Sequence, residues 1–269
     1  MMTLACRQLD PHPDSSTRQH SGPWLVWLHG LLGSGEDWLP VAELCGDYPS
    51  LLVDLPGHGK STAVKTRGFA DISQQLAETL QAYGIREYWL AGYSLGGRIA
   101  MYHACNGHHQ GLLGLLVEGG NLGLESDELR AQRLQHDRQW AQRFRHEPLP
   151  QVLADWYQQD VFADLDSQQR TQLVSLRAAN QGPAVADMLE ATSLGHQPWL
   201  LPALQRLSVP YTYLCGSRDQ KFQQLAHQYQ LPLRTLARAG HNAHRANPGA
   251  FAAQVLSFLS QSSFLSLSR

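Results

Sequence analysis

Short apolar runs recur along this chain and alternate with longer stretches of mixed polar and apolar residues. Short, nearly continuous apolar runs are typical of strands whose two faces are both covered by helices. The alternation therefore predicts βαβ units and a mainly parallel central sheet, in an α/β fold. The predicted strands are 24–28, 51–53, 88–91, 112–117, 211–215 and 233–236.

Helical spacing is clearest in two places. Apolar residues recur at helical intervals between residues 72 and 83, and Gly84 follows as a stop. Near the other end, Asn247 suits an N-cap and Pro248 suits the first helical position. We expect a helix at each place, and we expect the Ser-rich tail from residue 260 onward to fray.

One region, residues 121–207, breaks this alternation. It has no good strand, and its helical pattern is rich in Gln, Arg and Trp. We interpret it as a helical lid inserted into a single domain of residues 1–269, over the sheet edge where α/β active sites lie. A separate helical domain is the alternative, but the segment is short for one. Five prolines divide it into short helices: Pro148, Pro150, Pro183, Pro198 and Pro202.

Composition and charge argue against several classes of function. The 269 residues are 43% hydrophobic, enough for a full core, and the formal net charge is −2. We therefore expect no nucleic-acid partner and no membrane insertion, and no apolar stretch approaches the ~18 residues of a membrane-spanning helix. Residues 1–22 are polar and lack the apolar core of a secretory signal, and the four cysteines are scattered. The expected location is the cytoplasm.

The candidate nucleophile is Ser94. It lies in Gly92-Tyr93-Ser94-Leu95-Gly96, which matches the G-x-S-x-G pattern of a nucleophile elbow. The glycines are needed because such a serine occupies a tight strand-to-helix turn where flanking side chains would clash. The pattern alone is weak and an ordinary glycine-rich turn is the alternative. Here, however, an apolar strand precedes it and a helical stretch, 97–105, follows.

Two further residues complete a catalytic triad in the order expected for this elbow, serine, then acid, then histidine. Asp219 follows the predicted strand 211–215, and His241 follows the last strand. Glu118, at the end of strand 112–117, is the alternative acid. We expect His244 to support the site or to begin a helix. The three residues predict an α/β-hydrolase fold, with the helical lid inserted in it.

Backbone amides near Ser94 are candidates for an oxyanion hole. In this fold one N–H comes from the turn after the first central strand, here Leu31, and the other from the residue after the nucleophile, Leu95. Such donors stabilise negative charge that develops on a substrate oxygen. We assign the function to the Leu31 amide and interpret the His29 side chain as a structural brace of the turn.

No metal or cofactor is expected. His103, His108 and His109 lie near a helix end, but no carboxylate has ligand spacing with them, so we interpret them as a solvated surface cluster. Residues 30–35 lack the spacing of a phosphate-binding loop. A cysteine nucleophile is disfavoured because no cysteine has a suitable motif around it.

From residue 24 to about 258, the chain resembles the 2-succinyl-6-hydroxy-2,4-cyclohexadiene-1-carboxylate (SHCHC) synthases of menaquinone biosynthesis, a family of the α/β-hydrolase superfamily. The triad motifs are common across the superfamily, whereas the lid stretches are specific, because lids vary most between its families. The resemblance rests on residues 53–59, 92–98, 117–120, 137–144, 154–159 and 240–245.

The resemblance implies an elimination rather than a hydrolysis. The family expels pyruvate from a cyclohexene that bears succinyl, carboxylate and enolpyruvyl groups. Ser94, activated by His241 and Asp219, would then act as a general base and form no acyl-enzyme. The Leu31 and Leu95 amides would hold an enolate oxygen.

A substrate with three carboxylates calls for cations. By motif match the resemblance assigns substrate binding to Arg98, Arg133 and Arg177, with Tyr93, Trp156 and Lys221 completing the pocket. The alternative is that these arginines are solvated surface charges. Residues 121–200 hold seven arginines, no lysine and eleven acidic residues, a net charge of −4. The assignment therefore requires particular side chains to turn inward.

Two other functions remain open at this point. An esterase, thioesterase or carbon–carbon bond hydrolase on the same fold would use Ser94 as a nucleophile, and the triad cannot distinguish it. Three cations that face the pocket would distinguish it, because an esterase of apolar substrates has no need of them. A non-catalytic ligand-binding protein on this fold is the second alternative, disfavoured by the complete triad. The expected oligomeric state is a monomer.

Overall fold

The computed structural model describes residues 3–11, 22–107 and 109–266, with side chains described up to residue 262. All six predicted strands are present, and a seventh precedes them. Their bounds are β1 (Cys6–Leu9), β2 (Trp24–Leu28), β3 (Ser50–Val53), β4 (Tyr88–Tyr93), β5 (Leu112–Glu118), β6 (Tyr211–Gly216) and β7 (Leu233–Leu236).

The strands form one sheet in the order β1-β3-β2-β4-β5-β6-β7. All neighbours are parallel except β1, which pairs antiparallel with β3 in the register Cys6↔Val53. The pattern analysis missed β1 because this short edge strand is half polar, with Arg7 and Gln8 exposed. Its strand conformation depends on its pairing with β3.

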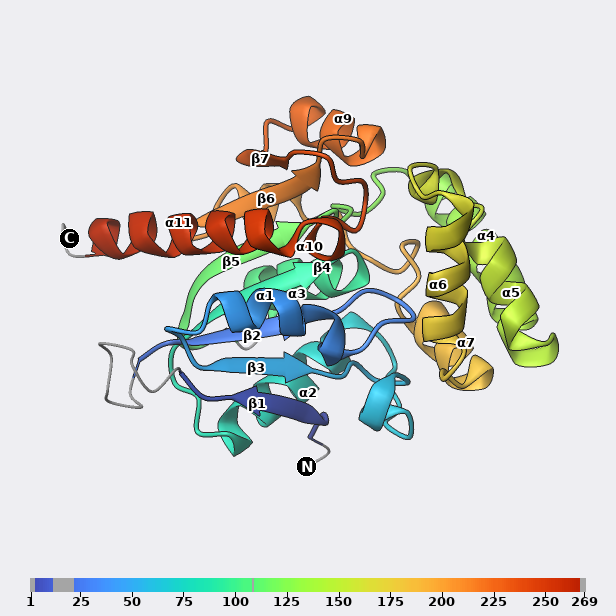
Figure 1. The fold of residues 1–269 in the computed structure, drawn as a ribbon, viewed down its shortest axis with the longest axis horizontal. Coiled ribbons are helices and arrows are strands. Elements are labelled where there is room, and N and C mark those ends of the chain that lie inside the picture. Colours follow the sequence, from blue (N-terminus) through green and yellow to red (C-terminus); the bar gives the residue numbers. More distant parts are fainter. Residues whose placement is uncertain (1–2, 12–21, 108, 267–269) are drawn as a thin grey trace.

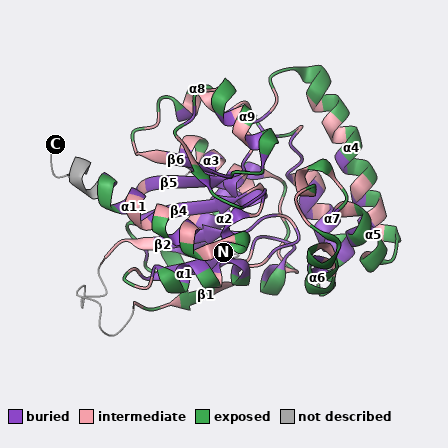
Figure 2. Cartoon of the chain, turned by 45° about the horizontal axis from the view of Figure 1, so that its top comes forward, coloured by how far each residue is buried: buried purple, intermediate pink, exposed green. Residues whose placement is uncertain are grey.

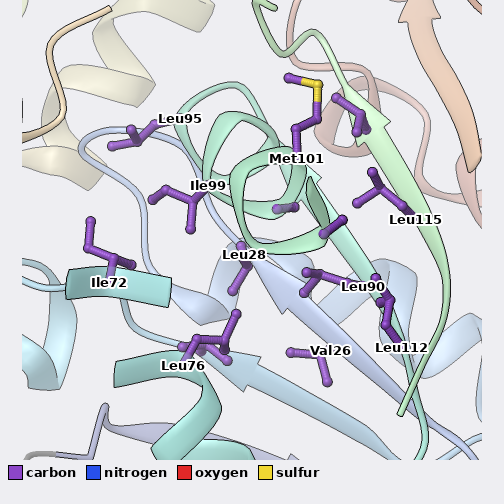
Figure 3. Close-up of a cluster of buried hydrophobic side chains, with 14 of the residues drawn as sticks. Val26, Leu28, Ile72, Leu76, Leu90, Leu95, Ile99, Met101, Leu112 and Leu115 are labelled. Carbon is purple, nitrogen blue, oxygen red and sulfur yellow. The ribbon is translucent and has the colours of Figure 1, made fainter. Parts of the chain in front are cut away.

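Helices cover both faces of the sheet (Figure 1). On one face, Val26 and Leu28 of β2 pack with Ile72 of α2 (Phe69–Ala82) and Ile99 of α3 (Leu95–Asn106), as Figure 3 shows. On the other face, Trp27 packs with residues of α1 (Leu39–Leu44) and α11 (Pro248–Ser266). Alternate residues of β2 thus enter different cores, which is the consequence of a two-residue side-chain period.

The predicted helical insertion lies between β5 and β6, beyond the carboxyl ends of the strands (Figure 1). The elements of the insertion are α4 (Asp127–His146), α5 (Leu149–Trp156), η3 (Asp160–Phe162), α6 (Ser167–Arg177), α7 (Gly182–Ala191) and α8 (Leu201–Leu204). Pro148 is the N-cap residue of α5, and Pro183 and Pro202 lie in the first turns of α7 and α8, where a missing N–H costs nothing. The outer faces of α4–α6 are exposed, whereas the inner strands β2–β6 are largely buried (Figure 2).

The end of the chain differs from the expectation. Helix α11 begins at Pro248 as predicted, but it continues through the tail expected to fray, to Ser266. Ser260 and Ser262 donate their hydroxyls to carbonyls of the preceding turn, and Ser262 is buried. Serine can therefore be accommodated in this helix without fraying it. Among the described residues, no helix is both long and apolar enough to span a membrane.

Candidate active site

Ser94 occupies the sharp turn between β4 and α3. Its backbone has φ 51° and ψ −110°, a conformation that non-glycine residues rarely adopt. A methyl group at Gly92 would collide with the carbonyl of Gly96, and one at Gly96 would collide with the carbonyl of Leu28. The Ser94 N–H donates to the carbonyl of Glu118 at 2.8 Å. The two glycines thus permit the strained turn that carries the serine to the sheet edge.

His241 and Asp219 form a close pair. The Nδ1–H of His241 donates to Oδ2 of Asp219 at 2.8 Å, and both side chains are buried. Asp219 also caps α9 (Gln220–Gln228) by accepting from the N–H of Phe222, whose ring stacks on His241 with centroids 4.9 Å apart. These contacts fix the imidazole and leave Nε2 as the ring nitrogen that can exchange a proton with a reacting group.

Ser94 and His241 line the same cavity, which has a volume of about 670 Å³. Within the described part of the chain, no hydrogen bond joins the Ser94 hydroxyl to His241. Proton transfer between the two side chains therefore requires this hydrogen bond to form. Such tightening is common when a substrate fills an active site.

Glu118, the alternative acid, pairs with a different histidine. Its Oε2 accepts from Nδ1 of His244 at 2.7 Å, and its Oε1 accepts from the backbone N–H groups of Ala243 and His244. Both side chains are buried, and the His244 ring stacks on Trp38 with centroids 4.1 Å apart. His244 is in the short helix α10 (Ala243–Ala246), so Glu118 anchors the backbone just after His241.

The two backbone amides expected to form an oxyanion hole follow two neighbouring strands, β2 and β4. Leu31 is in the turn after β2, and Leu95 is the first residue of α3. Among the backbone groups that the structure describes, neither N–H donates to a protein carbonyl. Neither amide is therefore committed to a backbone acceptor, although the described lining of the cavity includes neither Leu31 nor Leu95.

Two buried histidines brace the turn that contains Leu31. Nε2 of His29 accepts from the N–H of Leu55, and Nε2 of His58 accepts from the N–H of Leu32, each at 3.0 Å. Burial lowers the pKa of His29 to about 4 and that of His58 to about 3. Both rings are therefore neutral near pH 7, as their acceptor role demands. The interpretation of His29 as a structural brace is consistent with these bonds.

Three of the predicted cations line the cavity: Arg98, Arg133 and Lys221, the first two from α3 and α4. Burial lowers the pKa of Arg98 to about 9, and the charge of Arg133 acts in the same direction. Burial and then Arg133 also lower the pKa of Lys221. The cations disfavour one another's charge, so an anion in the cavity would relieve their repulsion.

Protein acceptors already hold two of these arginines. Arg98 donates to Gln197 Oε1 and to the carbonyl of Thr192, both at 2.6 Å. Arg133 donates through Nε to the buried Asp137 at 2.7 Å, which leaves its terminal nitrogens without a protein acceptor among the described residues. Arg133 is thus oriented by one bond and can still bind an anion with its other N–H groups.

Arg177 and Tyr93 are placed differently from the other predicted residues. The described lining of the cavity includes neither. Arg177 is buried and donates to Asp37 at 2.7 Å; burial alone would raise the pKa of Asp37, but Arg177 and Arg245 outweigh it and lower that pKa. The Tyr93 ring lies against the rings of His241 and His244, with centroids 5.2 and 4.8 Å away.

Several cavity residues escaped the sequence analysis. Trp156 lines the cavity as expected, but Gln159 lies three residues after it, and His136 lies three residues after Arg133 on α4. Residues three apart share a helix face, so this spacing could have identified His136. The other additional lining residues are Gly119, Asn121, Asp160, Val161, Phe162, Leu194 and Phe222.

The histidines considered for a metal site do not form one cluster. His103 is buried, not solvated as expected, and its ring nitrogens bond to Ser73 and Tyr88 at 2.8 Å each. His103 lies on the buried face of α3, which places its ring inside the protein. His109 is exposed, and His108 lies outside the described residues. Among the residues described, no group of three or more His, Cys, Asp or Glu side chains could hold a metal ion.

The cysteines offer no alternative nucleophile. All four are free, and two are buried. Burial raises the pKa of every one of these thiols, so they remain protonated at neutral pH. None of them lines the cavity that holds Ser94.

Comparison with known proteins links this geometry to a family. The model of the alpha/beta hydrolase family matches residues 25–254. A Yersinia enterocolitica protein named 2-succinyl-6-hydroxy-2,4-cyclohexadiene-1-carboxylate synthase is 85% identical over 266 residues, which cover 99% of this chain and 97% of that protein. A protein of the same name from Yersinia pseudotuberculosis is 81% identical over the whole of both chains.

Solved structures agree with this relationship. The structure of MenH from S. aureus superposes with a TM-score of 0.86 and 27% identity, covering 97% of this chain and 100% of that one. A thermophilic esterase from Thermogutta terrifontis superposes with a TM-score of 0.78 at 18% identity, covering 96% of this chain and 93% of that one. At that identity the second likeness concerns the fold alone.

Proposed function

The chain belongs to the SHCHC synthases of the α/β-hydrolase family, and on this premise we propose how its cavity carries out their reaction. The enzyme is a lyase of menaquinone biosynthesis. It eliminates pyruvate from 2-succinyl-5-enolpyruvyl-6-hydroxy-3-cyclohexene-1-carboxylate and forms SHCHC. The proposal concerns which residues perform each step.

Ser94 is the general base in this proposal. His241, oriented by Asp219, accepts the hydroxyl proton as Ser94 removes the ring proton next to the succinyl ketone. The electron pair of that C–H bond enters the ring, the ring double bond shifts, and the bond to the enolpyruvyl oxygen breaks. The released enolpyruvate takes up a proton and becomes pyruvate, and the ring is left as a conjugated diene.

The amides of Leu31 and Leu95 stabilise the charge that develops on the ketone oxygen. Their N–H groups are not used by backbone carbonyls within the described residues. Preorganised donors of this kind contribute about 3–4 kcal/mol each to a transition state. A hydrolase uses the same donors for a tetrahedral oxyanion, so this part of the site does not require an ester substrate.

The cationic cavity is the observation that carries the proposal. Arg98, Arg133 and Lys221 line the same cavity as Ser94 and His241. The substrate carries three carboxylates, which complement the positive charges of these side chains. Trp156 provides an apolar surface for the cyclohexene ring. The Tyr93 ring supports the position of His241 by contact with its imidazole. Substrate binding by Arg177 stays a prediction, and it requires the guanidinium to exchange Asp37 for a substrate carboxylate.

The remaining features of the proposal follow from the same arrangement. The helical insertion acts as a lid within a single domain, because it supplies Arg133 and Trp156 to the cavity. The four free cysteines favour a reducing compartment such as the cytoplasm. We propose a monomer, since each named cavity residue comes from one chain.

Pyruvate release from the purified pathway intermediate tests the proposed function. The chain should release one pyruvate per substrate, and Ser94→Ala should abolish release without loss of fold. Mass spectrometry of the enzyme quenched during turnover should detect no covalent adduct on Ser94. An adduct would instead support a nucleophilic serine, as in an esterase, thioesterase or carbon–carbon bond hydrolase. Absence of pyruvate release would overturn the assignment.

A further inference from the structure

The turn that contains Leu31 is attached to the helical insertion as well as to the sheet. The residue after Leu31, Leu32, has φ 68°, in the left-handed region that non-glycine residues rarely adopt. Its side chain is 1% exposed and belongs to the apolar cluster of the insertion, with Phe144, Leu153 and Val185. The turn thus contributes Leu32 to a cluster whose other buried members lie between residues 141 and 189.

Polar bonds reinforce this attachment. Nδ2 of Asn180, between α6 and α7, donates to the carbonyl of Leu32 at 2.9 Å and to the carbonyl of Arg177 at 3.0 Å. Both N–H groups of the Asn180 amide are therefore used, one by the turn that contains Leu31 and one by the end of α6. Further along the turn, Asp37 accepts from the N–H of Ser34 and from Arg177.

From these contacts we infer that the helical insertion positions the oxyanion-hole amide of Leu31, with Leu32 and Asn180 as the positioning residues. A strained φ persists only where surrounding contacts hold it, and the Leu32 contacts come from the insertion on one side and from His58 on the other. The Leu31 N–H belongs to the peptide unit just before the one that joins Leu31 to Leu32, so its direction depends on how firmly Leu32 is held. Loosening Leu32 therefore lets the free Leu31 N–H turn away from the substrate oxygen.

A consequence is that two functions of the insertion are mechanically joined. The same insertion supplies Arg133 and Trp156 to the cavity and holds half of the oxyanion hole. Movement of the insertion would change carboxylate binding and the stabilisation of the enolate oxygen together. This inference rests on the proposed function, because it assigns a partner to the Leu31 amide.

The test compares variants matched in size and location. Leu32→Ala and Asn180→Ala should each speed hydrogen exchange in the segment 29–34, with exchange in β2 unchanged. Leu173→Ala removes the same atoms from the same cluster, but at a position on α6 rather than in the turn, so exchange in 29–34 should stay as in the wild type. Exchange is measured without substrate, so this arm tests the attachment independently of the reaction catalysed.

Kinetics then test the positioning role. Leu32→Ala should lower kcat by ~10-fold or more with KM changed less than about 3-fold, because an oxyanion donor acts mainly in the transition state. Leu32→Met should restore most of kcat, and Leu173→Ala should keep it. Equal losses in Leu32→Ala and Leu173→Ala, or wild-type exchange in Asn180→Ala, would overturn the inference. Failure of the wild-type enzyme to release pyruvate would instead overturn the proposed function.

Discussion

Two carboxylate–imidazole pairs lie at the sheet edge, and their difference separates a candidate catalytic pair from a structural one. The Nδ1-to-carboxylate distance is 2.8 Å in Asp219–His241 and 2.7 Å in Glu118–His244. Both imidazoles contact the same tyrosine ring, that of Tyr93.

The pairs differ in what the second ring nitrogen meets. His241 lines the cavity together with Ser94, so its Nε2 can exchange a proton with a reacting group. His244 is stacked on Trp38, and its Nε2 is buried without a hydrogen-bond partner among the described residues. Access to the cavity, rather than the pair itself, therefore separates a candidate base from a brace.

Removal of the charge on Asp219 tests the catalytic side of this comparison and has the largest expected effect. Asp219→Asn should lower kcat by about 10⁴-fold, because an amide favours the wrong imidazole tautomer. Asparagine can still cap α9, so the free energy of unfolding should change little. Coupled assay of pyruvate release and urea denaturation measure the two quantities. A kcat within about 10-fold of the wild type would remove Asp219 from the triad.

The matching change in the Glu118–His244 pair should affect stability instead. Glu118→Gln leaves one carbonyl oxygen for three donors, so the free energy of unfolding should fall by about 2–3 kcal/mol. The loss in kcat should be far smaller than that in Asp219→Asn. Glu128→Gln, at an exposed position on α4, is the control and should stay within about 0.5 kcal/mol of the wild type. A kcat loss as large as that of Asp219→Asn would make Glu118 part of the catalytic unit.

The cations that line the cavity provide a further test, which concerns substrate binding. Arg133→Ala should lower kcat/KM by about 2 kcal/mol, roughly 30-fold, if the guanidinium binds a substrate carboxylate. Arg138→Ala, on an exposed position of the same helix, should leave kcat/KM unchanged. Steady-state kinetics with the pathway intermediate measure both. An unchanged kcat/KM in Arg133→Ala would mean that Arg133 binds no substrate carboxylate.

The smallest expected effect concerns the pH dependence of the free energy of unfolding, to which the buried residues His29 and His58 contribute. The pKa values of His29 and His58 are lowered in the fold to about 4 and about 3, whereas unfolded histidine titrates near its model value of 6.5. The unfolded chain therefore binds more protons as the pH falls below 6.5, and the folded state loses stability until the folded pKa values are reached.

Between pH 7 and pH 6 these two histidines should together remove about 1 kcal/mol from the free energy of unfolding. Urea denaturation at the two pH values measures this difference. His58→Gln should show a shallower dependence than the wild type, because one of the two titrating groups is gone. A dependence as steep as in the wild type would mean that His58 is not neutral in the fold.

Local sequence determined much of this protein. The six predicted strands and the position of the helical insertion could be inferred from apolar runs, because strands covered on both faces must be apolar throughout. The sharp turn at Ser94 could be inferred because it requires glycine at positions 92 and 96. The family could also be inferred, since the motifs of the insertion are specific to it.

Tertiary structure decided the side-chain contacts that no motif predicts. The strand order brings the ends of β5 and β6 together, and only then does Glu118 reach His244 while Asp219 reaches His241. Burial of Arg177 against Asp37 and attachment of Leu32 to the insertion join residues 140 and 148 positions apart. No local pattern encodes such pairings, because they depend on how the insertion packs over the sheet edge. That packing selects which cations face the cavity.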